Sequence, residues 1–355
     1  MLTPRRLSVF GGAERVSFLL SRCLRDRGWD VDALSAQHLV RKTKFNAVED
    51  FALSLAVGRL AALMASHYEL IVSTNGWGAW AGSKPRRINI NCDVSAAMYL
   101  AMRALTLKYR IGRWSRQYIE RRSGEHAYNV AISRQIKEQV ERYYGNRVAR
   151  IIEPGIHVDY YQPISDDARA SRRERAGISP DTTVVLFVGR MEERKGTDLF
   201  NDVSRRFSER RPAVRFVVAA PTLEAEWQAE GIDYRIGTSN AEVRELYRIA
   251  DVLFFPSRYE GYGLAPMEAL AAGTPVIASP VGVLSELPAR DPELGRWVAS
   301  QIDLDELHGR LVQYCELDLE DRRQLRHRAR AYAERWCTIE RFNREWLDTI
   351  AEVME

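Results

Sequence analysis

Hydrophobic and polar positions along the chain alternate between short apolar runs and longer stretches in which apolar residues recur every three or four positions. The short runs predict strands, and the longer stretches predict amphipathic helices. In the first half, strands are predicted at residues 7–10, 31–34, 70–74, 88–92, 130–133 and 148–152. Because a helical pattern lies between successive strands, the pattern predicts an α/β fold with a parallel sheet.

The same alternation resumes after a break at residues 153–163, where Pro154, Gly155 and Pro163 interrupt it. Strands are predicted at 184–188, 216–219 and 252–255, and Ser239 with Glu242 predicts a capping box at the start of a helix. We therefore expect two Rossmann-like domains in tandem, residues 1–157 and 158–337. A last helix is predicted at about 338–355, with apolar residues at helical spacing at Phe342, Trp346 and Ile350.

Composition supports two globular domains in a reducing compartment. The chain has 355 residues, of which 46% are hydrophobic, which is ample for two cores. Four cysteines are far apart, without the spacing of a disulfide framework or a metal site. The first residues lack the apolar core of a signal peptide, and no run of about 18 apolar residues could span a bilayer. We expect a cytoplasmic protein, or one that is peripheral at the inner face of the membrane, without a metal or other cofactor.

Positive charge is concentrated in the first part of the chain. Residues 1–160 contain 25 Lys and Arg against 14 Asp and Glu, and the densest part is 102–122, where basic residues alternate with aromatic ones such as Trp114 and Tyr118. This composition suits an anionic membrane surface or a lipid-diphosphate acceptor. A helix with a solvated basic face is the alternative. No nucleic-acid-binding module accompanies the charge, so nucleic acid is not an expected partner.

Two glutamates, Glu260 and Glu268, are separated by seven residues that follow a predicted strand and begin a helix. The residues directly after Glu260 are Gly261, Tyr262, Gly263 and Leu264. Free backbone N–H groups at such a strand-to-helix loop favour an anion such as a diphosphate, and a glutamate in the first helical turn can accept hydrogen bonds from sugar hydroxyls. The alternative is a pair of solvated glutamates or helix caps.

Two further loops have residues suited to phosphate. Gly189 and Arg190 follow a predicted strand, and Lys195 precedes the next helix, so two cations can neutralise a diphosphate and the charge that builds on it as a sugar departs. A solvated charge run is the alternative. Gly11 and Gly12 lie between the first predicted strand and helix, where a ligand can approach the backbone, although a tight turn would use the same residues.

Together these motifs resemble the E-x7-E signature of retaining, nucleotide-sugar-dependent glycosyltransferases of the GT-B fold, namely glycosyltransferase family four, or glycosyl transferases group 1. The resemblance implies two Rossmann-like domains whose parallel sheets face across a cleft, with the last helix returning to the first domain. It also implies that Glu268 holds the ribose, that Glu260 approaches the donor sugar, and that Arg190 and Lys195 hold the diphosphate without a metal. The glycine loop at 11–12 would face the donor.

The chain departs from the family at Asp93, where many relatives have a histidine near the transferred sugar. Asp93 could accept a hydrogen bond from a sugar hydroxyl, or it could cap a helix that begins near Ser95. We therefore expect Glu260, Arg190, Lys195 and Asp93 to serve catalysis.

The predicted reaction is the retaining transfer of a hexose from a UDP- or GDP-linked sugar to a hydroxyl of a saccharide or lipid-linked saccharide, in the assembly of bacterial surface polysaccharide, glycolipid or glycoconjugate. Two alternatives remain: a non-catalytic subunit that binds nucleotide sugars, and another GT-B enzyme such as a sugar-nucleotide epimerase.

Overall fold

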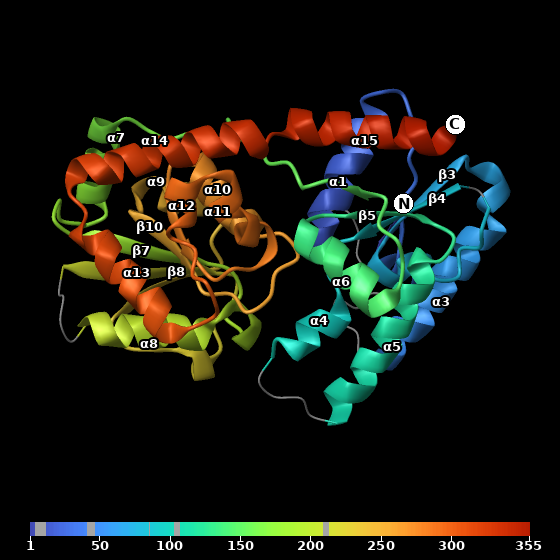
Figure 1. The fold of residues 1–355 in the computed structure, drawn as a ribbon, viewed down its shortest axis with the longest axis horizontal. Helices are drawn as coiled ribbons and strands as arrows, with labels where there is room; N and C mark the ends of the chain where they lie inside the picture. Colours follow the sequence, from blue (N-terminus) through green and yellow to red (C-terminus); the bar gives the residue numbers. More distant parts are fainter. Residues whose placement is uncertain (4–11, 41–46, 85, 103–106, 209–212) are drawn as a thin grey trace. The chain divides into compact units, whose positions relative to one another are not determined.

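A computed structural model describes residues 1–3, 12–40, 47–84, 86–102, 107–208 and 213–355. The chain forms two compact units (Figure 1). Unit 1 comprises Met1–Gly155 together with Glu340–Glu355, and unit 2 comprises Ile156–Ile339. The strand predicted at 7–10 and the glycine Gly11 lie outside the described residues.

Unit 1 contains a parallel sheet whose described strands run in the order β2-β1-β3-β4-β5-β6. Their bounds are β1 Leu2–Thr3, β2 Leu34–Ser35, β3 Leu70–Thr74, β4 Arg86–Asn91, β5 Tyr128–Ala131 and β6 Arg150–Ile151. The prediction of a parallel sheet is confirmed for these strands, and β3 has the predicted bounds. The strand predicted at 31–34 is wrong in its bounds: the observed strand, β2, is Leu34–Ser35, and its two residues pair with Leu2 and Thr3 of β1.

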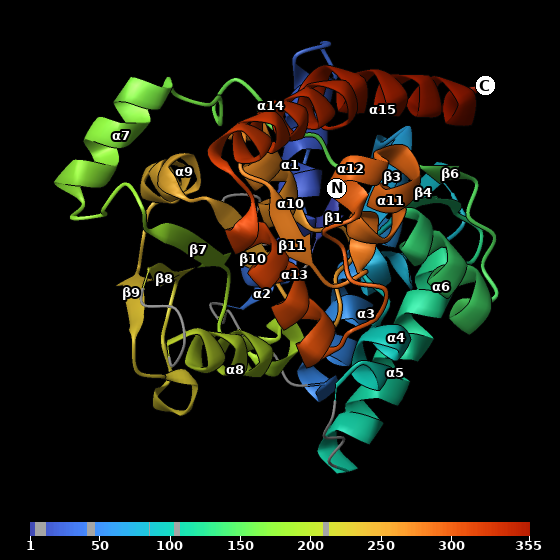
Figure 2. The same ribbon diagram turned by 60° about the vertical axis from the view of Figure 1, so that its left-hand side comes forward.

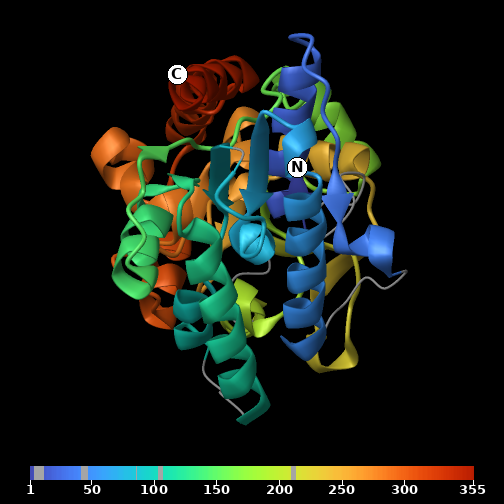
Figure 3. The ribbon, with the colours of Figure 1, turned by 90° about the vertical axis from the view of Figure 1, so that its right-hand side faces the viewer.

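The helices of unit 1 lie between these strands along the chain and at its end. They are α1 Gly12–Arg25, α2 Ala36–Leu39, α3 Ala47–Leu63, α4 Ser95–Leu100, α5 Leu107–Gly124, α6 Arg134–Tyr144 and α15 Ile339–Met354. Short 3-10 turns lie at η1 Ala65–His67 and η2 Asn75–Gly78. Figure 3 shows α3 and α5 side by side. The apolar stripe of α15, Phe342, Trp346 and Ile350, is buried, and α15 runs beside α1 (Figure 1).

Buried polar side chains connect α5 to the centre of the sheet in unit 1. The Ser73 and Ser123 hydroxyls donate to Oδ1 of Asn89 at 3.0 and 2.8 Å, and Asn129 donates to the Gly124 carbonyl at 2.9 Å. Hydrogen bonds are directional, so they fix the end of α5 against the sheet more specifically than apolar packing would. This contact positions the part of α5 that carries Glu120.

Unit 2 contains a second parallel sheet, in which the described strands run in the order β11-β10-β7-β8-β9 (Figure 2). The strands are β7 Thr183–Val188, β8 Val214–Ala220, β9 Ile232–Ile236, β10 Val252–Phe255 and β11 Val276–Ala278. Strand β10 has the predicted bounds, and β7 and β8 begin one or two residues earlier than predicted. Strand β9 lies at the edge of the sheet, where charged residues such as Asp233 and Arg235 are tolerated, so no continuous apolar run indicated it.

The helices of unit 2 are α7 Asp166–Arg175, α8 Thr197–Ser208, α9 Asn240–Ile249, α10 Leu264–Ala271, α11 Leu287–Arg290, α12 Pro292–Gly295, α13 Leu304–Glu316 and α14 Leu319–Trp336. Short 3-10 turns lie at η3 Glu193–Lys195, η4 Ala225–Trp227 and η5 Gly282–Glu286. The predicted capping box is confirmed at the start of α9: the Ser239 hydroxyl accepts from the Glu242 N–H, and the Glu242 carboxylate accepts from the Ser239 N–H at 2.7 Å.

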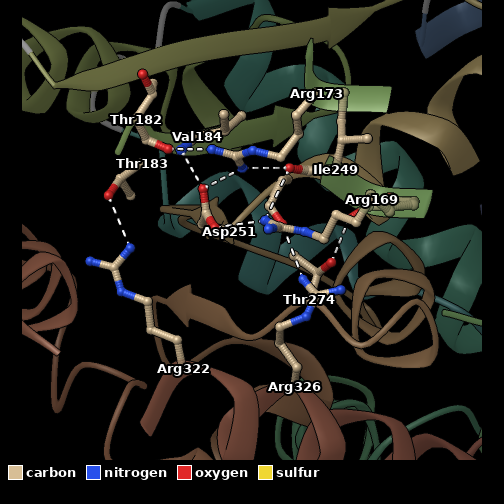
Figure 4. Close-up of polar contacts among 12 residues, drawn as sticks. Arg169, Arg173, Thr182, Thr183, Val184, Ile249, Asp251, Thr274, Arg322 and Arg326 are labelled. Carbon is tan, nitrogen blue, oxygen red and sulfur yellow. Dashed lines mark hydrogen bonds and ion pairs between the residues drawn. The ribbon is translucent and has the colours of Figure 1, made fainter. Parts of the chain in front are cut away.

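A cluster of arginines surrounds Asp251, at the amino end of β10 (Figure 4). Arg169 and Arg173 of α7 donate to its two carboxylate oxygens at 2.7 and 2.8 Å, and the backbone N–H of Val184 donates at 2.7 Å. Burial alone would raise the pKa of Asp251, but the two arginines outweigh burial and lower it. Asp251 therefore remains ionised and ties α7 to the start of two strands.

Two more arginines, from α14, lie in the same cluster. Arg322 donates to the Thr183 hydroxyl at 3.2 Å and lies over the ring of Tyr314. Burial, followed by the charge of Arg169, lowers the pKa of Arg326 to about 10. Positive charge therefore exceeds negative charge around Asp251.

Membrane-spanning helices, metal sites and disulfides can be examined among the described residues. No helix among them is both long and apolar enough to cross a membrane. In the same part of the chain, no group of three or more His, Cys, Asp or Glu side chains could hold a metal ion. No disulfide links the four cysteines, all of which lie in the described residues, and Cys315 is the one among them that is partly exposed.

Candidate donor-binding site

The loop after β10 and the start of α10 bring the predicted glycines to the carboxyl edge of the unit 2 sheet. Gly263 has φ +108°, a conformation that favours glycine, and it is the N-cap of α10. Because the chain turns there, α10 begins at Leu264, and Glu268 lies in the second turn of the helix. The prediction of a first-turn position for Glu268 was therefore wrong by about one turn.

Glu268 is a buried carboxylate held in place by a tyrosine. The hydroxyl of Tyr247, on α9, donates to Oε2 of Glu268 at 3.3 Å, and both side chains are buried. A buried carboxylate with a fixed orientation can accept hydrogen bonds from vicinal hydroxyls with little loss of side-chain entropy. The sequence pattern indicated Tyr247 as part of an apolar helix face and gave no sign of this hydroxyl contact.

Glu260 is buried and paired with cations from a second loop. Nζ of Lys195 lies 2.6 Å from Oε1 of Glu260, and a guanidinium nitrogen of Arg194 lies 3.8 Å from Oε2. Burial acts to raise the pKa of Glu260, but the charges of Lys195 and Arg194 outweigh it, so the pKa lies below its usual value. Glu260 is therefore an ionised partner of Lys195 at neutral pH.

A close backbone contact joins the loop that carries Lys195 to the loop after β10. Gly196 has φ +70°, and a Cβ on it would lie 2.0 Å from the Pro256 carbonyl oxygen, so no side chain fits there. Arg194 donates to the Tyr259 carbonyl at 3.2 Å, and Nζ of Lys195 lies 5.5 Å from the centre of the Phe255 ring. The two motifs, 65 residues apart in sequence, thus form one structure.

A buried ion pair that the sequence did not indicate fixes the same contact. Arg258 donates to both carboxylate oxygens of Asp198 at 2.6 and 2.5 Å, and to the Glu193 carbonyl at 2.7 Å. A bidentate pair of this kind restrains both groups in one plane. The sequence gives no local pattern for this pair, because its two residues are 60 positions apart.

Arg190 lies at the same edge but points outward. It directly follows Gly189, whose φ is +147°, and its side chain is 62% exposed, with a guanidinium nitrogen 3.5 Å from Glu192. Strands β7 and β10 are neighbours in the sheet, so their carboxyl ends meet at one edge. This edge combines an exposed cation, Arg190, with a largely buried one, Lys195.

The remaining predicted residues belong to unit 1. Gly12 is the first residue of α1, and Gly11 lies outside the described residues. Asp93 follows β4, and its Oδ1 accepts a hydrogen bond from the Asn75 amide at 3.0 Å. Helix α4 begins at Ser95 with Val94 as its N-cap, without a side-chain cap, so the capping alternative for Asp93 is wrong.

Glu120 of α5 is a fully buried carboxyl near Asp93. It accepts from the backbone and hydroxyl of Ser95 at 3.0 and 2.5 Å, and from the hydroxyl of Tyr144. Burial, followed by the charge of Asp93, raises the pKa of Glu120 to about 7. Glu120 therefore changes its charge near neutral pH.

This raised pKa predicts a pH-dependent effect of Glu120→Gln. Because the folded pKa exceeds its usual 4.5, the contribution of Glu120 to stability is fully present below pH 4.5 and is lost as pH rises through about 7. At about 1.4 kcal/mol per pKa unit, the loss is of the order of 3 kcal/mol. Urea unfolding should show the variant gaining stability relative to wild type between pH 4.5 and 8. Glu125→Gln, at the residue that follows α5 and with a side chain that is 41% exposed, is the control; a pH-independent difference for Glu120→Gln would contradict the prediction.

Two Rossmann-like units in tandem are the architecture of the GT-B fold. The carboxylates and cations described above lie at the carboxyl edge of the sheet in the second unit. Solved structures share this fold. Sucrose-phosphate synthase from Thermosynechococcus elongatus has a TM-score of 0.81, with 19% identity over 99% of this chain and 98% of that one. Anabaena HepE, solved in complex with UDP-glucose, has a TM-score of 0.71, with 15% identity over 99% of both chains.

Residues 168–336 match the family described as glycosyl transferases group 1. A similar curated protein is the D-inositol 3-phosphate glycosyltransferase of Geodermatophilus obscurus, which is 36% identical over 166 residues. That match covers 41% of this chain and 36% of the relative. The chain thus matches well under half of that relative's length, and the likeness concerns part of each protein.

Proposed function

We propose that this protein is a retaining glycosyltransferase that transfers a hexose from a UDP- or GDP-linked sugar to a hydroxyl of a saccharide or lipid-linked saccharide. The observation that carries the proposal is that the loop after β10 and the helix that follows it, α10, carry two buried carboxylates: Glu260, which pairs with Lys195, and Glu268, which Tyr247 holds. A buried carboxylate and a buried cation at the start of a helix suit the two ends of a nucleoside diphosphate.

Each group then has a distinct task toward the donor. Glu268 accepts hydrogen bonds from the ribose hydroxyls. The backbone N–H groups at the start of α10, after Gly263, face the diphosphate. Arg190 and Lys195 supply positive charge, the first by moving from solvent onto the donor and the second from its fixed place beside Glu260.

The reaction replaces one bond at the anomeric carbon. The bond from this carbon to the diphosphate oxygen breaks, the acceptor oxygen bonds to the same face of the sugar, and the acceptor proton passes to the departing diphosphate. Negative charge grows on the diphosphate during this step, and Arg190 and Lys195 stabilise it. Glu260 keeps Lys195 in position; its ion pair and lowered pKa make it a poor proton donor.

Product analysis tests this proposal. UDP-, GDP- and ADP-linked glucose and mannose are incubated with the protein, and the release of nucleotide and sugar is followed by chromatography and NMR. One donor should be cleaved, slowly without an acceptor and faster with an oligosaccharide acceptor, and the anomeric configuration should be retained. Inversion would contradict the retaining mechanism. An epimerised nucleotide sugar would support the epimerase alternative, and binding without turnover would support a non-catalytic subunit.

The proposal also places the acceptor at a membrane surface. On α5, Trp114 is 73% exposed and stacks with Tyr118, which is 44% exposed, at a ring distance of 6.4 Å. Arg121 follows on the same helix and is largely exposed. Exposed aromatic rings beside arginines suit the headgroup region of an anionic bilayer, where the rings enter the interface and the guanidinium groups meet phosphate. A lipid-linked acceptor would be found there.

Vesicle binding is the corresponding prediction. The wild type should co-sediment with vesicles of phosphatidylglycerol and phosphatidylcholine more than with phosphatidylcholine alone, and the double variant Trp114→Ala, Tyr118→Ala should bind about tenfold more weakly. Leu63→Ala, which removes another exposed apolar side chain of unit 1, is the control. Equal binding by the double variant and the control would contradict a membrane role for this face of α5.

A further inference from the structure

Asn75 has an unusual backbone conformation at the carboxyl end of β3. Its φ is +49°, in the left-handed region that side chains other than glycine seldom adopt. The turn that follows is closely packed: a Cβ on Gly76 would lie 2.3 Å from Ile119, and one on Gly78 would lie 2.4 Å from the Ser73 hydroxyl. The chain must therefore turn sharply at Asn75, between β3 and the packed glycines.

The amide of Asn75 joins the ends of two neighbouring strands. Its Oδ1 accepts from the backbone N–H of Cys92 at 2.7 Å, and its Nδ2 donates to Oδ1 of Asp93 at 3.0 Å. Strands β3 and β4 pair in parallel, with Thr74 opposite Ile90, so these bonds extend the pairing beyond the sheet. Glycine would adopt this backbone without the strain of about 1 kcal/mol that a side chain incurs there. Compared with glycine, asparagine contributes a side-chain amide at this position.

Asp93 lies near other acidic groups, whose charges disfavour its ionised form. The acidic group of Glu120, on α5, disfavours the ionised form of Asp93. The hydroxyl of Tyr144, on α6, also lies close enough for its pKa to be raised by the charge of Asp93. Burial raises the pKa of the adjacent Cys92 thiol, as do the charges of Asp93 and, from α1, Glu14. A hydrogen bond from the neutral Asn75 amide stabilises the ionised form of Asp93 and fixes one of its oxygens.

We propose that Asn75 is a positioning residue that orients the Asp93 carboxylate to accept a hydrogen bond from a hydroxyl of the bound saccharide. The proposal rests on the proposed function. Asp93 is half-buried at the carboxyl edge of its sheet, where a saccharide can reach it, whereas the Asn75 amide bonds to Cys92 and Asp93. Asn75 thus acts through Asp93.

A double-mutant cycle tests this dependence. Asn75→Gly keeps the left-handed backbone and removes the amide, and it is combined with Asp93→Ala. Glucose release from UDP-glucose and GDP-glucose is measured, and thermal unfolding is followed in parallel. Asn75→Gly alone should lower kcat/KM roughly 10- to 100-fold relative to the wild type. Added to Asp93→Ala, it should cause no further loss. Equal losses in both backgrounds, or a change in unfolding temperature alone, would overturn the proposal.

A second variant gives a readout that a purely structural role would not change. Asn75→Asp retains the acceptor for the Cys92 N–H but places a carboxylate against Asp93, so the pKa of Asp93 should rise and the acidic limb of the pH–rate profile should move up by about one unit. An unchanged limb would count against the proposal. A wild type that releases no sugar from any UDP- or GDP-linked glucose or mannose would contradict the proposed function, and this proposal with it; if mannose is the sugar released, the cycle is measured with that donor. An active wild type that tolerates Asn75→Gly would overturn this proposal alone.

Discussion

Lys195→Met should lower the rate of sugar transfer about a thousandfold while leaving the fold intact. Nζ of Lys195 lies 2.6 Å from the Glu260 carboxylate in a largely buried position, so its charge acts where water screens it little. Removing one preorganised donor from a group that gains charge in the transition state costs about 10²- to 10³-fold in kcat. The loss should be in kcat, measured as nucleotide release at saturating donor, more than in KM.

The same variant leaves the buried Glu260 carboxylate with the Arg194 guanidinium, 3.8 Å away, as a weaker cationic partner, so the pKa of Glu260 should rise and the protein should lose some stability. The double variant Lys195→Met, Glu260→Gln removes both charges and should recover stability without recovering rate. Lys137→Met, which removes a partly exposed lysine of α6 that pairs with Glu141, is the control. A double variant that recovers activity would show that Lys195 serves only to neutralise Glu260.

Asp251→Asn should destabilise unit 2 by about 3–5 kcal/mol, the usual cost of removing one partner of a buried ion pair. The variant keeps the size of the side chain but removes the charge that Arg169 and Arg173 share, while Arg322 and Arg326 remain close (Figure 4). Arg326 already has a pKa lowered to about 10, so the cluster has little capacity for further uncompensated positive charge. Urea unfolding at neutral pH measures the loss.

An exposed aspartate provides the control for this experiment. Asp159 is 98% exposed and lies 3.8 Å from Arg330, so Asp159→Asn should change stability by less than about 0.5 kcal/mol. The folded pKa of Asp251 is lowered, so its contribution is present above the unfolded value of 3.8 and is lost as pH falls through the folded pKa. A loss below 1 kcal/mol at neutral pH would show that the arginines are solvated well enough without Asp251.

The sequence predicted the donor unit more accurately than the first unit, for physical reasons. Strand β10 and the glycine loop after it are determined by local signals: a continuous apolar run, a glycine with positive φ and a helix start. In unit 1 the strand predicted at 31–34 is observed as Leu34–Ser35, because its bounds are set by pairing with Leu2 and Thr3, which are distant in sequence. Edge strand β9 carries charged residues and produced no apolar run.

The sequence did not reveal residues whose hydrogen-bond or ion-pair partners are distant along the chain. Tyr247 reaches Glu268, Arg258 reaches Asp198, and Asn75 reaches Asp93, and in each case the two residues belong to different elements. A residue pattern shows which side chains can bind a ligand, but not which neighbours fix their orientation. One sign was available for Asn75, since an asparagine before glycine is typical of a sharp turn.

Binding of the nucleotide itself tests the central claim most directly. Titration calorimetry with UDP, GDP and ADP is performed on the wild type, on Glu268→Ala and on Glu293→Ala, an exposed glutamate of α12 that serves as the control. We predict that one nucleotide binds the wild type and the control equally, and binds Glu268→Ala at least tenfold more weakly. Equal binding to all three proteins, or no binding to any of them, would contradict the assignment of the donor site.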